Sequence, residues 1–160
     1  MPPIYLLDLK EYDLNQVMFG PADLERANPQ RGDMRQLDGI CWAGFKGEHM
    51  VAVGFKDCRP DEFWVPGHIP GRPLLPGVLM IEAAAQLAAF MIKEFRKEPG
   101  FLGFVGCDEV KFRGQVAPGQ RLYILGQETE YRPGRRFTCR TQGLCEDKLV
   151  FESTIRGMAI

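Results

Sequence analysis

The sequence predicts an α+β fold in which a curved antiparallel sheet wraps around one long central helix. One run of helix-forming residues, 78–92, is apolar on all sides and should therefore be buried. The residues after it form β-prone segments that are separated by short turns, which is typical of an antiparallel meander. With 160 residues and 45% apolar content, the chain is long enough for one core. We therefore expect a single domain that spans residues 1–160.

The predicted helix begins after a Pro-Gly pair at 76–77 and ends before a second pair at 99–100. Three cations near its end suit the negative end of the helix dipole: Lys93, Arg96 and Lys97. The apolar run falls short of the ~20 residues that a membrane span requires, and it contains Glu82 and Gln86. We expect a buried helix of a soluble protein, with no membrane insertion.

Six β segments are predicted around this helix. Residues 40–45 and 50–55 are apolar and β-prone, and the turn at 46–48 between them indicates a hairpin. Four more segments follow the helix and are separated by turns at 118–119, 133–134 and 146–148: residues 101–116, 121–131, 136–144 and 149–158. The first 40 residues carry the weakest pattern, with a helical turn at 23–27 and turn chemistry at 28–33.

Composition and charge argue against several classes of function. Lys and Arg total 20 against 21 for Asp and Glu, so the chain lacks the basic surface that nucleic-acid binding needs. The five cysteines are odd in number and form no C-x-x-C pair, so neither a disulfide framework nor a zinc site is predicted. No basic and then apolar secretory signal opens the chain. We expect a cytoplasmic protein with reduced cysteines, no metal and no cofactor.

Two polar residues stand where apolar or turn residues dominate. Glu82 lies on the first turns of the apolar helix, with Gln86 four residues on and so on the same face. His68 lies in residues 60–76, which five prolines constrain to a stiff loop. Taken singly, Glu82 could simply interact with the helix dipole and His68 could face solvent. Together with a helix start, they are the groups needed for acid–base chemistry beside an activated carbonyl.

The residues around this pair resemble a known family. The run GHIPGRPLLPGVLMIEAAAQ at 67–86 closely resembles the signature of β-hydroxyacyl-acyl-carrier-protein dehydratases, and the resemblance continues more loosely through 103–119. It implies the hot-dog fold, dehydration in fatty acid or lipid biosynthesis, and acyl carrier protein as a partner. It also implies a homodimer whose active sites lie at the interface, with histidine and glutamate from different subunits. A further trimer of dimers is left open.

The same resemblance assigns roles to individual residues. His68 would remove the C2 proton of a (3R)-hydroxyacyl thioester, and Glu82 would protonate the departing C3 hydroxyl to yield a trans-2-enoyl thioester. Gly77, at the helix N-terminus, would offer its N–H to the thioester oxygen. Gln86 would orient Glu82 or a water rather than react. Position 82 holds glutamate and not aspartate. In this respect the chain resembles the branch of the family that dehydrates without isomerising the double bond.

One segment departs from the family pattern. The family has a proline-histidine-arginine element near its N-terminus, whereas this chain has an atypical stretch at Gln30–Gln36. This difference leaves acyl chain length undetermined. Two alternatives stay open: a hot-dog acyl-CoA thioesterase, since one fold supports several chemistries, and a non-catalytic acyl-binding subunit, which the altered segment allows.

Overall fold

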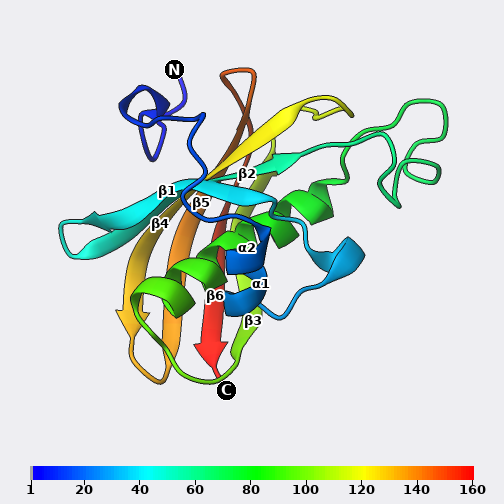
Figure 1. Cartoon of the computed structure of the whole chain (residues 1–160). Coiled ribbons are helices and arrows are strands. Elements are labelled where there is room, and N and C mark those ends of the chain that lie inside the picture. The colour runs from blue at the N-terminus through cyan, green and yellow to red at the C-terminus, as the bar shows by residue number, and fades with distance from the viewer. Residues whose placement is uncertain (1) are drawn as a thin grey trace.

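The computed structural model describes residues 2–160 and contains one six-stranded antiparallel sheet that curves around a long helix (Figure 1). Strands β1 (Gly39–Lys46) and β2 (His49–Asp57) precede helix α2 (Gly77–Phe95). Strands β3 (Leu102–Phe112), β4 (Arg121–Arg132), β5 (Arg136–Cys145) and β6 (Lys148–Ala159) follow it. The α+β architecture with a wrapped central helix is confirmed.

Short hairpins connect neighbouring strands where the sequence placed turns. Glu146 and Asp147 both have positive φ angles between paired Cys145 and Lys148, as a two-residue hairpin requires. Gly47 and Gly134 take the same backbone region in the β1–β2 and β4–β5 turns. The predicted turns are therefore present.

The order of strands in the sheet is β1-β2-β4-β5-β6-β3. Strand β3 pairs with β6 and not with β4, the next strand along the chain, so residues 113–120 cross between the two edges of the meander. This strand also ends at Phe112, whereas the sequence predicted strand through residue 116. Because β6 is its one neighbour in the sheet, β3 is an edge strand with one unpaired side.

Helix α2 packs against the concave face of the sheet. Its buried positions are Met80, Ala83, Ala84, Gln86, Leu87, Ala88, Phe90, Met91 and Ile92. The helix approaches β4 closely because Gly126 has no side chain: a Cβ there would lie 3.0 Å from Sδ of Met91 and 3.2 Å from Cδ2 of Leu87. Among residues 2–160, no helix is long and apolar enough to cross a membrane.

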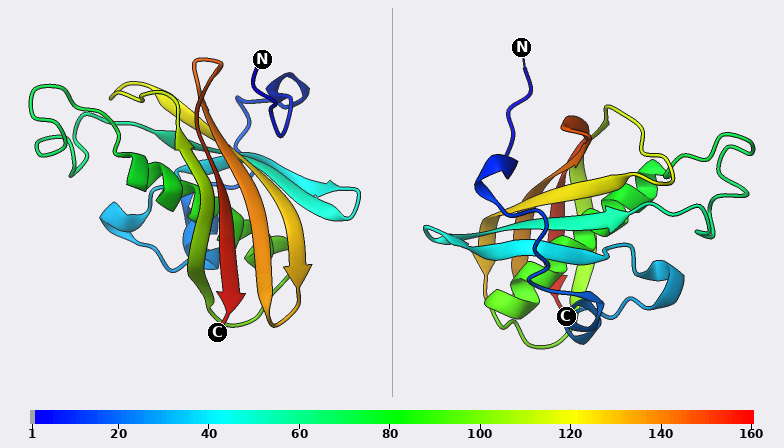
Figure 2. Two further views of the ribbon diagram at one scale, coloured as in Figure 1. Left: turned by 180° about the vertical axis from the view of Figure 1, so that it is seen from behind. Right: turned by 45° about the horizontal axis from the view of Figure 1, so that its top comes forward.

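Residues 2–37 wrap around the outside of this unit (Figure 2). They contain two short 3₁₀ turns, η1 (Leu9–Glu11) and η2 (Gly32–Met34), and helix α1 (Pro21–Ala27). Alternate residues of a strand face opposite sides of a sheet, so β2 turns Ala52 toward α2 and Val51 and Val53 outward. Leu7 packs on these outward side chains and is buried. Residues 6–14 therefore cover an apolar patch on the convex face of the sheet.

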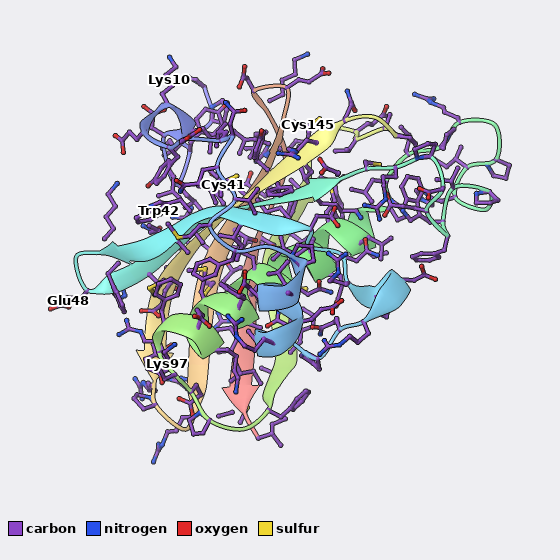
Figure 3. The ribbon with its side chains drawn as sticks, viewed as in Figure 1. Lys10, Cys41, Trp42, Glu48, Lys97 and Cys145 are labelled. Carbon is purple, nitrogen blue, oxygen red and sulfur yellow. The ribbon has the colours of Figure 1, made fainter. Side chains whose placement is uncertain are left out.

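Four of the five cysteines are buried, and Cys107 on β3 is exposed. Cys41 on β1 and Cys145 on β5 are labelled in Figure 3. No two cysteines among residues 2–160 form a disulfide, as all five are free.

Candidate active site

His68 lies in the loop that joins β2 to α2, and Figure 1 shows this loop extending away from the sheet and helix. Its Nδ1 atom is 2.7 Å from the carbonyl oxygen of Leu74. Because a carbonyl only accepts hydrogen bonds, Nδ1 must carry the proton. In the neutral ring, Nε2 then holds the free lone pair and can act as a base.

The backbone around His68 is fixed on both sides. The His68 N–H donates to the carbonyl of Trp64 at 2.7 Å, and the Arg72 N–H donates to that of Ile69 at 2.8 Å. Ile69 has a φ of 58°, which is unusual for a β-branched residue. These turns fix the backbone at His68, and the hydrogen bond to Leu74 sets the direction of the imidazole.

A buried ion pair fixes the start of this loop to the sheet. The Nζ of Lys56 lies 2.6 Å from Oε1 of Glu62, and both side chains are almost fully buried. The second oxygen of Glu62 accepts the backbone N–H of Arg59 at 2.8 Å. Sequence reasoning missed this pair, because the partner of a buried lysine is not visible in a local pattern.

The thiol of Cys58, at the start of the same loop, is not a candidate nucleophile. Burial raises the pKa of Cys58 to about 12, and the charge of Glu62 acts in the same direction. The thiol therefore stays protonated near neutral pH, and thiols react as thiolates.

The N-terminus of α2 presents backbone N–H groups that no side chain caps. Gly77 is its first residue, and a Cβ at this position would lie 2.7 Å from Cε1 of Phe112 on β3. Glycine therefore lets the half-exposed Phe112 ring pack against the helix start. Phe112 was not among the predicted site residues, since its contact with Gly77 joins segments 35 positions apart in the sequence.

Glu82 and Gln86 lie one turn apart on α2 and are hydrogen bonded. The Nε2 group of Gln86 donates to Oε1 of Glu82 at 2.8 Å. Its second N–H donates to the carbonyl of Met34 at 2.6 Å, and its oxygen accepts the N–H groups of Gln36 (2.9 Å) and Leu37 (3.1 Å). All the hydrogen-bonding capacity of this buried amide is used.

The same glutamine therefore links Glu82 to the atypical Gln30–Gln36 stretch. The backbone carbonyl of Gln86 also accepts a hydrogen bond from Nδ2 of Asn28 at 2.9 Å. Residues 28–37 are thus tied to the face of α2 that carries Glu82.

A small cavity of about 140 Å³ opens beside Glu82. It is lined by Gln30, Glu82, Ala85, Gln86, Ala89, Phe101, Leu102, Gly103, Phe104, Phe137 and Ile155. His68 is not among these residues, so one chain does not place the imidazole in the cavity of the carboxyl group. Among residues 2–160, no group of three or more His, Cys, Asp or Glu could hold a metal ion.

Two solved structures share this architecture. The dehydratase heterocomplex ApeI:P from Xenorhabdus doucetiae has a TM-score of 0.67 and 15% identity, over 86% of this chain and 90% of that one. A putative thioesterase, YhdA from Lactococcus lactis, has a TM-score of 0.65 and 9% identity, over 80% of this chain and 94% of that one. At these identities the likeness concerns the fold alone, and it confirms the predicted hot-dog fold.

The amino-acid sequence is similar to curated 3-hydroxyacyl-[acyl-carrier-protein] dehydratases named FabZ. The one from Syntrophobacter fumaroxidans is 39% identical over 107 residues, which are 64% of this chain and 71% of that protein. The one from Alkaliphilus metalliredigens is 45% identical over 83 residues, and the one from Syntrophomonas wolfei is 44% identical over 79 residues. These two matches cover 51% and 49% of this chain, and 56% and 55% of the relatives.

The sequence model of the FabA-like domain matches residues 28–154, which include His68, Gly77, Glu82 and Gln86. Residues 6–14, which cover the convex face of the sheet, precede this match. Because the match spans well over half of the chain, this protein belongs to the family of FabA-like domains.

Proposed function

We propose that the chain dehydrates (3R)-hydroxyacyl thioesters on acyl carrier protein to trans-2-enoyl thioesters and water, as a step of fatty acid biosynthesis. The curated relatives bear the name of this activity. The observation that carries the proposal is the hydrogen bond between Nδ1 of His68 and the Leu74 carbonyl. It leaves Nε2 as a base on a rigid loop, within the same family match that contains a carboxyl group beside a cavity.

The reaction requires one proton to leave C2 and one to reach the C3 oxygen. Nε2 of His68 takes the C2 proton, and the electron pair of that C–H bond moves toward the thioester carbonyl. Glu82, in its protonated form, gives its proton to the C3 hydroxyl as the C–O bond breaks and water leaves. The electron pair then forms the double bond between C2 and C3.

Charge develops on the thioester oxygen during this step. The Gly77 N–H at the start of α2 is the proposed donor to that oxygen, and the positive end of the helix dipole acts at the same place. No cofactor takes part in this scheme.

Gln86 is the proposed positioning residue for Glu82. Its amide is held by three backbone groups, so the N–H that faces Oε1 of Glu82 has a fixed direction. Oε2 accepts no hydrogen bond from residues 2–160 and is the oxygen we assign to the proton transfer.

A homodimer would bring the two reactive groups together. Strand β3 has one unpaired side and carries three half-exposed apolar side chains: Phe104, Val105 and Phe112. Exposed apolar edge strands are templates for pairing with another chain. Pairing of two β3 strands would extend the sheet and let the protruding His68 loop of one subunit reach the Glu82 cavity of the other. A trimer of dimers and a cytoplasmic location stay predictions.

The assay follows enoyl absorbance on (3R)-hydroxyacyl carrier-protein substrates of several chain lengths, with His68→Ala and Glu82→Gln as the inactive variants. Loss of turnover in both variants, with folding intact, is expected. Equal amounts of the two variants, unfolded and refolded together, should regain about a quarter of wild-type activity, since half the dimers carry one intact site of two. A mixture that stays inactive would contradict the shared site.

The alternatives give different products. Release of a free thiol without enoyl absorbance would indicate a thioesterase. Binding of acyl carrier protein with no turnover at any chain length would indicate a non-catalytic subunit, and either result would overturn the dehydratase proposal.

A further inference from the structure

The cavity beside Glu82 continues into a second and larger one. The second cavity has a volume of about 400 Å³ and shares four lining residues with the first: Gln30, Ala89, Phe101 and Leu102. One wall of the second is formed by residues 25–31 and the other by residues 100–102. The two cavities together form a groove that leads away from Glu82, which we call the α2 groove.

The floor of the α2 groove is a single face of helix α2. Glu82, Ala85, Ala89 and Lys93 line it, and successive members are three or four residues apart, as neighbours on one helical face are. The side chains of Ala85 and Ala89 are short and leave space above this face of the helix. Eleven residues at the helical rise give a length of roughly 16 Å from Glu82 to Lys93.

The lining of the groove changes from apolar to charged along this path. Beside Glu82 it includes Phe104, Phe137 and Ile155, which suit an alkyl chain. At the far end it is lined by four charged residues instead: Glu25, Arg26, Arg31 and Lys93. An alkyl terminus would gain little at such an end, because it would remove water from charged groups without replacing their hydrogen bonds.

Two of these four charged residues, Arg26 and Glu25, form ion pairs with residues of opposite charge. The guanidinium of Arg26 lies 2.9 Å from Asp23, and the carboxylate of Glu25 lies 3.6 Å from Arg35. They contribute little net potential to the groove.

The other two, Arg31 and Lys93, are held by neutral carbonyls. Nη1 of Arg31 donates to the carbonyl oxygens of Asn28 (2.8 Å) and Gln30 (3.0 Å), and Nη2 donates to that of Glu25 (2.6 Å). Nζ of Lys93 donates to the carbonyls of Glu98 and Gly100. Among residues 2–160, neither cation has a carboxylate within 4.0 Å, so the far end of the groove carries two uncompensated positive charges.

We propose that the far end of the α2 groove binds a carboxylate at the distal end of the substrate's acyl chain. The preferred substrates are then 3-hydroxyacyl thioesters of dicarboxylic acids. The donors left for this carboxylate are Nε and the second N–H of Nη2 on Arg31, and the third N–H of Lys93. This inference rests on the proposed dehydratase function and adds a substrate class to it.

The test compares kcat/KM for two pantetheine thioesters of equal chain length, one ending in a carboxylate and the other in its methyl ester. Pantetheine thioesters contain no acyl carrier protein, so the charge cannot act by changing how the carrier protein docks. Wild type should prefer the carboxylate by roughly ten-fold, a typical effect of a hydrogen bond to a charged group. Lys93→Met, which keeps the length of the side chain, should reduce the ratio toward one, and Lys93→Glu should invert it.

Lys97→Met is the matched control. Lys97 lies just beyond the C-terminal end of α2 (Figure 3), has a side chain that is 74% exposed and does not line the groove. Both kcat/KM values should match wild type in this variant.

The outcomes separate the two proposals. No turnover of either thioester, or of carrier-protein substrates, would overturn the dehydratase function. Turnover of both with equal kcat/KM, a preference that Lys93→Met does not change, or one that appears only on carrier-protein substrates, would overturn the carboxylate site alone.

Discussion

Removing Lys56 tests how strongly the buried ion pair holds the His68 loop to the sheet. The side chains of Lys56 and Glu62 are only 1% and 7% exposed, and Nζ lies 2.6 Å from Oε1. Lys56→Met keeps the volume of the side chain but leaves a buried carboxylate with one remaining donor, the Arg59 N–H. Removing one partner of a buried pair costs roughly 3–5 kcal/mol, and the remaining hydrogen bond favours the lower end, about 3 kcal/mol.

The measurement is the free energy of unfolding in urea, with far-ultraviolet circular dichroism as the signal. A double variant, Lys56→Met with Glu62→Leu, should recover most of the loss, because an apolar pair of similar volume often replaces a buried ion pair without cost. Arg26→Met, which breaks the solvent-exposed pair with Asp23, should have a far smaller effect. If Lys56→Met destabilised no more than Arg26→Met, the loop would not depend on the buried pair.

Three further outcomes are expected. Burial and the hydrogen bond to Glu98 raise the pKa of Tyr131 to about 12, so its contribution to stability is complete below about pH 10 and is lost as the pH rises through 12. Wild type should therefore lose more stability over that range than Tyr131→Phe. Equal slopes of the unfolding free energy against pH in the two proteins would refute this. Gln86→Leu leaves two buried backbone N–H groups without an acceptor and should destabilise by roughly 2–4 kcal/mol. Its kcat should fall as well, whereas kcat should be unchanged in Gln142→Leu, which removes an equally buried amide far from the site. Burial raises the pKa of the thiols of Cys41, Cys58, Cys139 and Cys145, so a thiol reagent near pH 8 should modify only Cys107 in the folded chain and all five cysteines after unfolding. Early modification of a second thiol would contradict the buried arrangement.

The central helix and its polar residues could be predicted from the sequence because the determinants are local. Apolar residues on every side identify a buried helix, and its observed bounds, Gly77–Phe95, extend the predicted run by one residue before and three after. A spacing of four residues places Glu82 and Gln86 on one face, and their side chains are hydrogen bonded there. Short turns likewise follow from residues within each turn.

The order of strands could not be predicted in the same way. Strand β3 pairs with β6, which lies far along the chain, because the chain crosses to the other edge of the meander after Phe112. No local pattern near Phe112 specifies that crossing. The contact between Phe112 and Gly77 depends on it, so this site residue was also missed.

Residues 2–37 were the least predictable because side chains far away in the sequence determine their path. Gln142 on β5 accepts the N–H of Leu6 and donates to the carbonyl of Ile4, both at 2.8 Å. These hydrogen bonds satisfy backbone groups that a sheet or helix would otherwise pair. A segment anchored in this way shows no period of its own in the sequence.

Gln86 connects the least predictable segment to the most predictable one. Its amide binds Gln36 and Leu37 on one side and Glu82 on the other, so a shift of residues 34–37 would change the hydrogen bond that orients the carboxyl group. The atypical Gln30–Gln36 stretch thus touches the site twice, through this amide and through Gln30 in the wall of the α2 groove. A change of sequence in this stretch can therefore alter substrate preference while both proposed reactive residues stay in place, which is consistent with a family signature that is intact around His68 and Glu82 and a departure from the family pattern here.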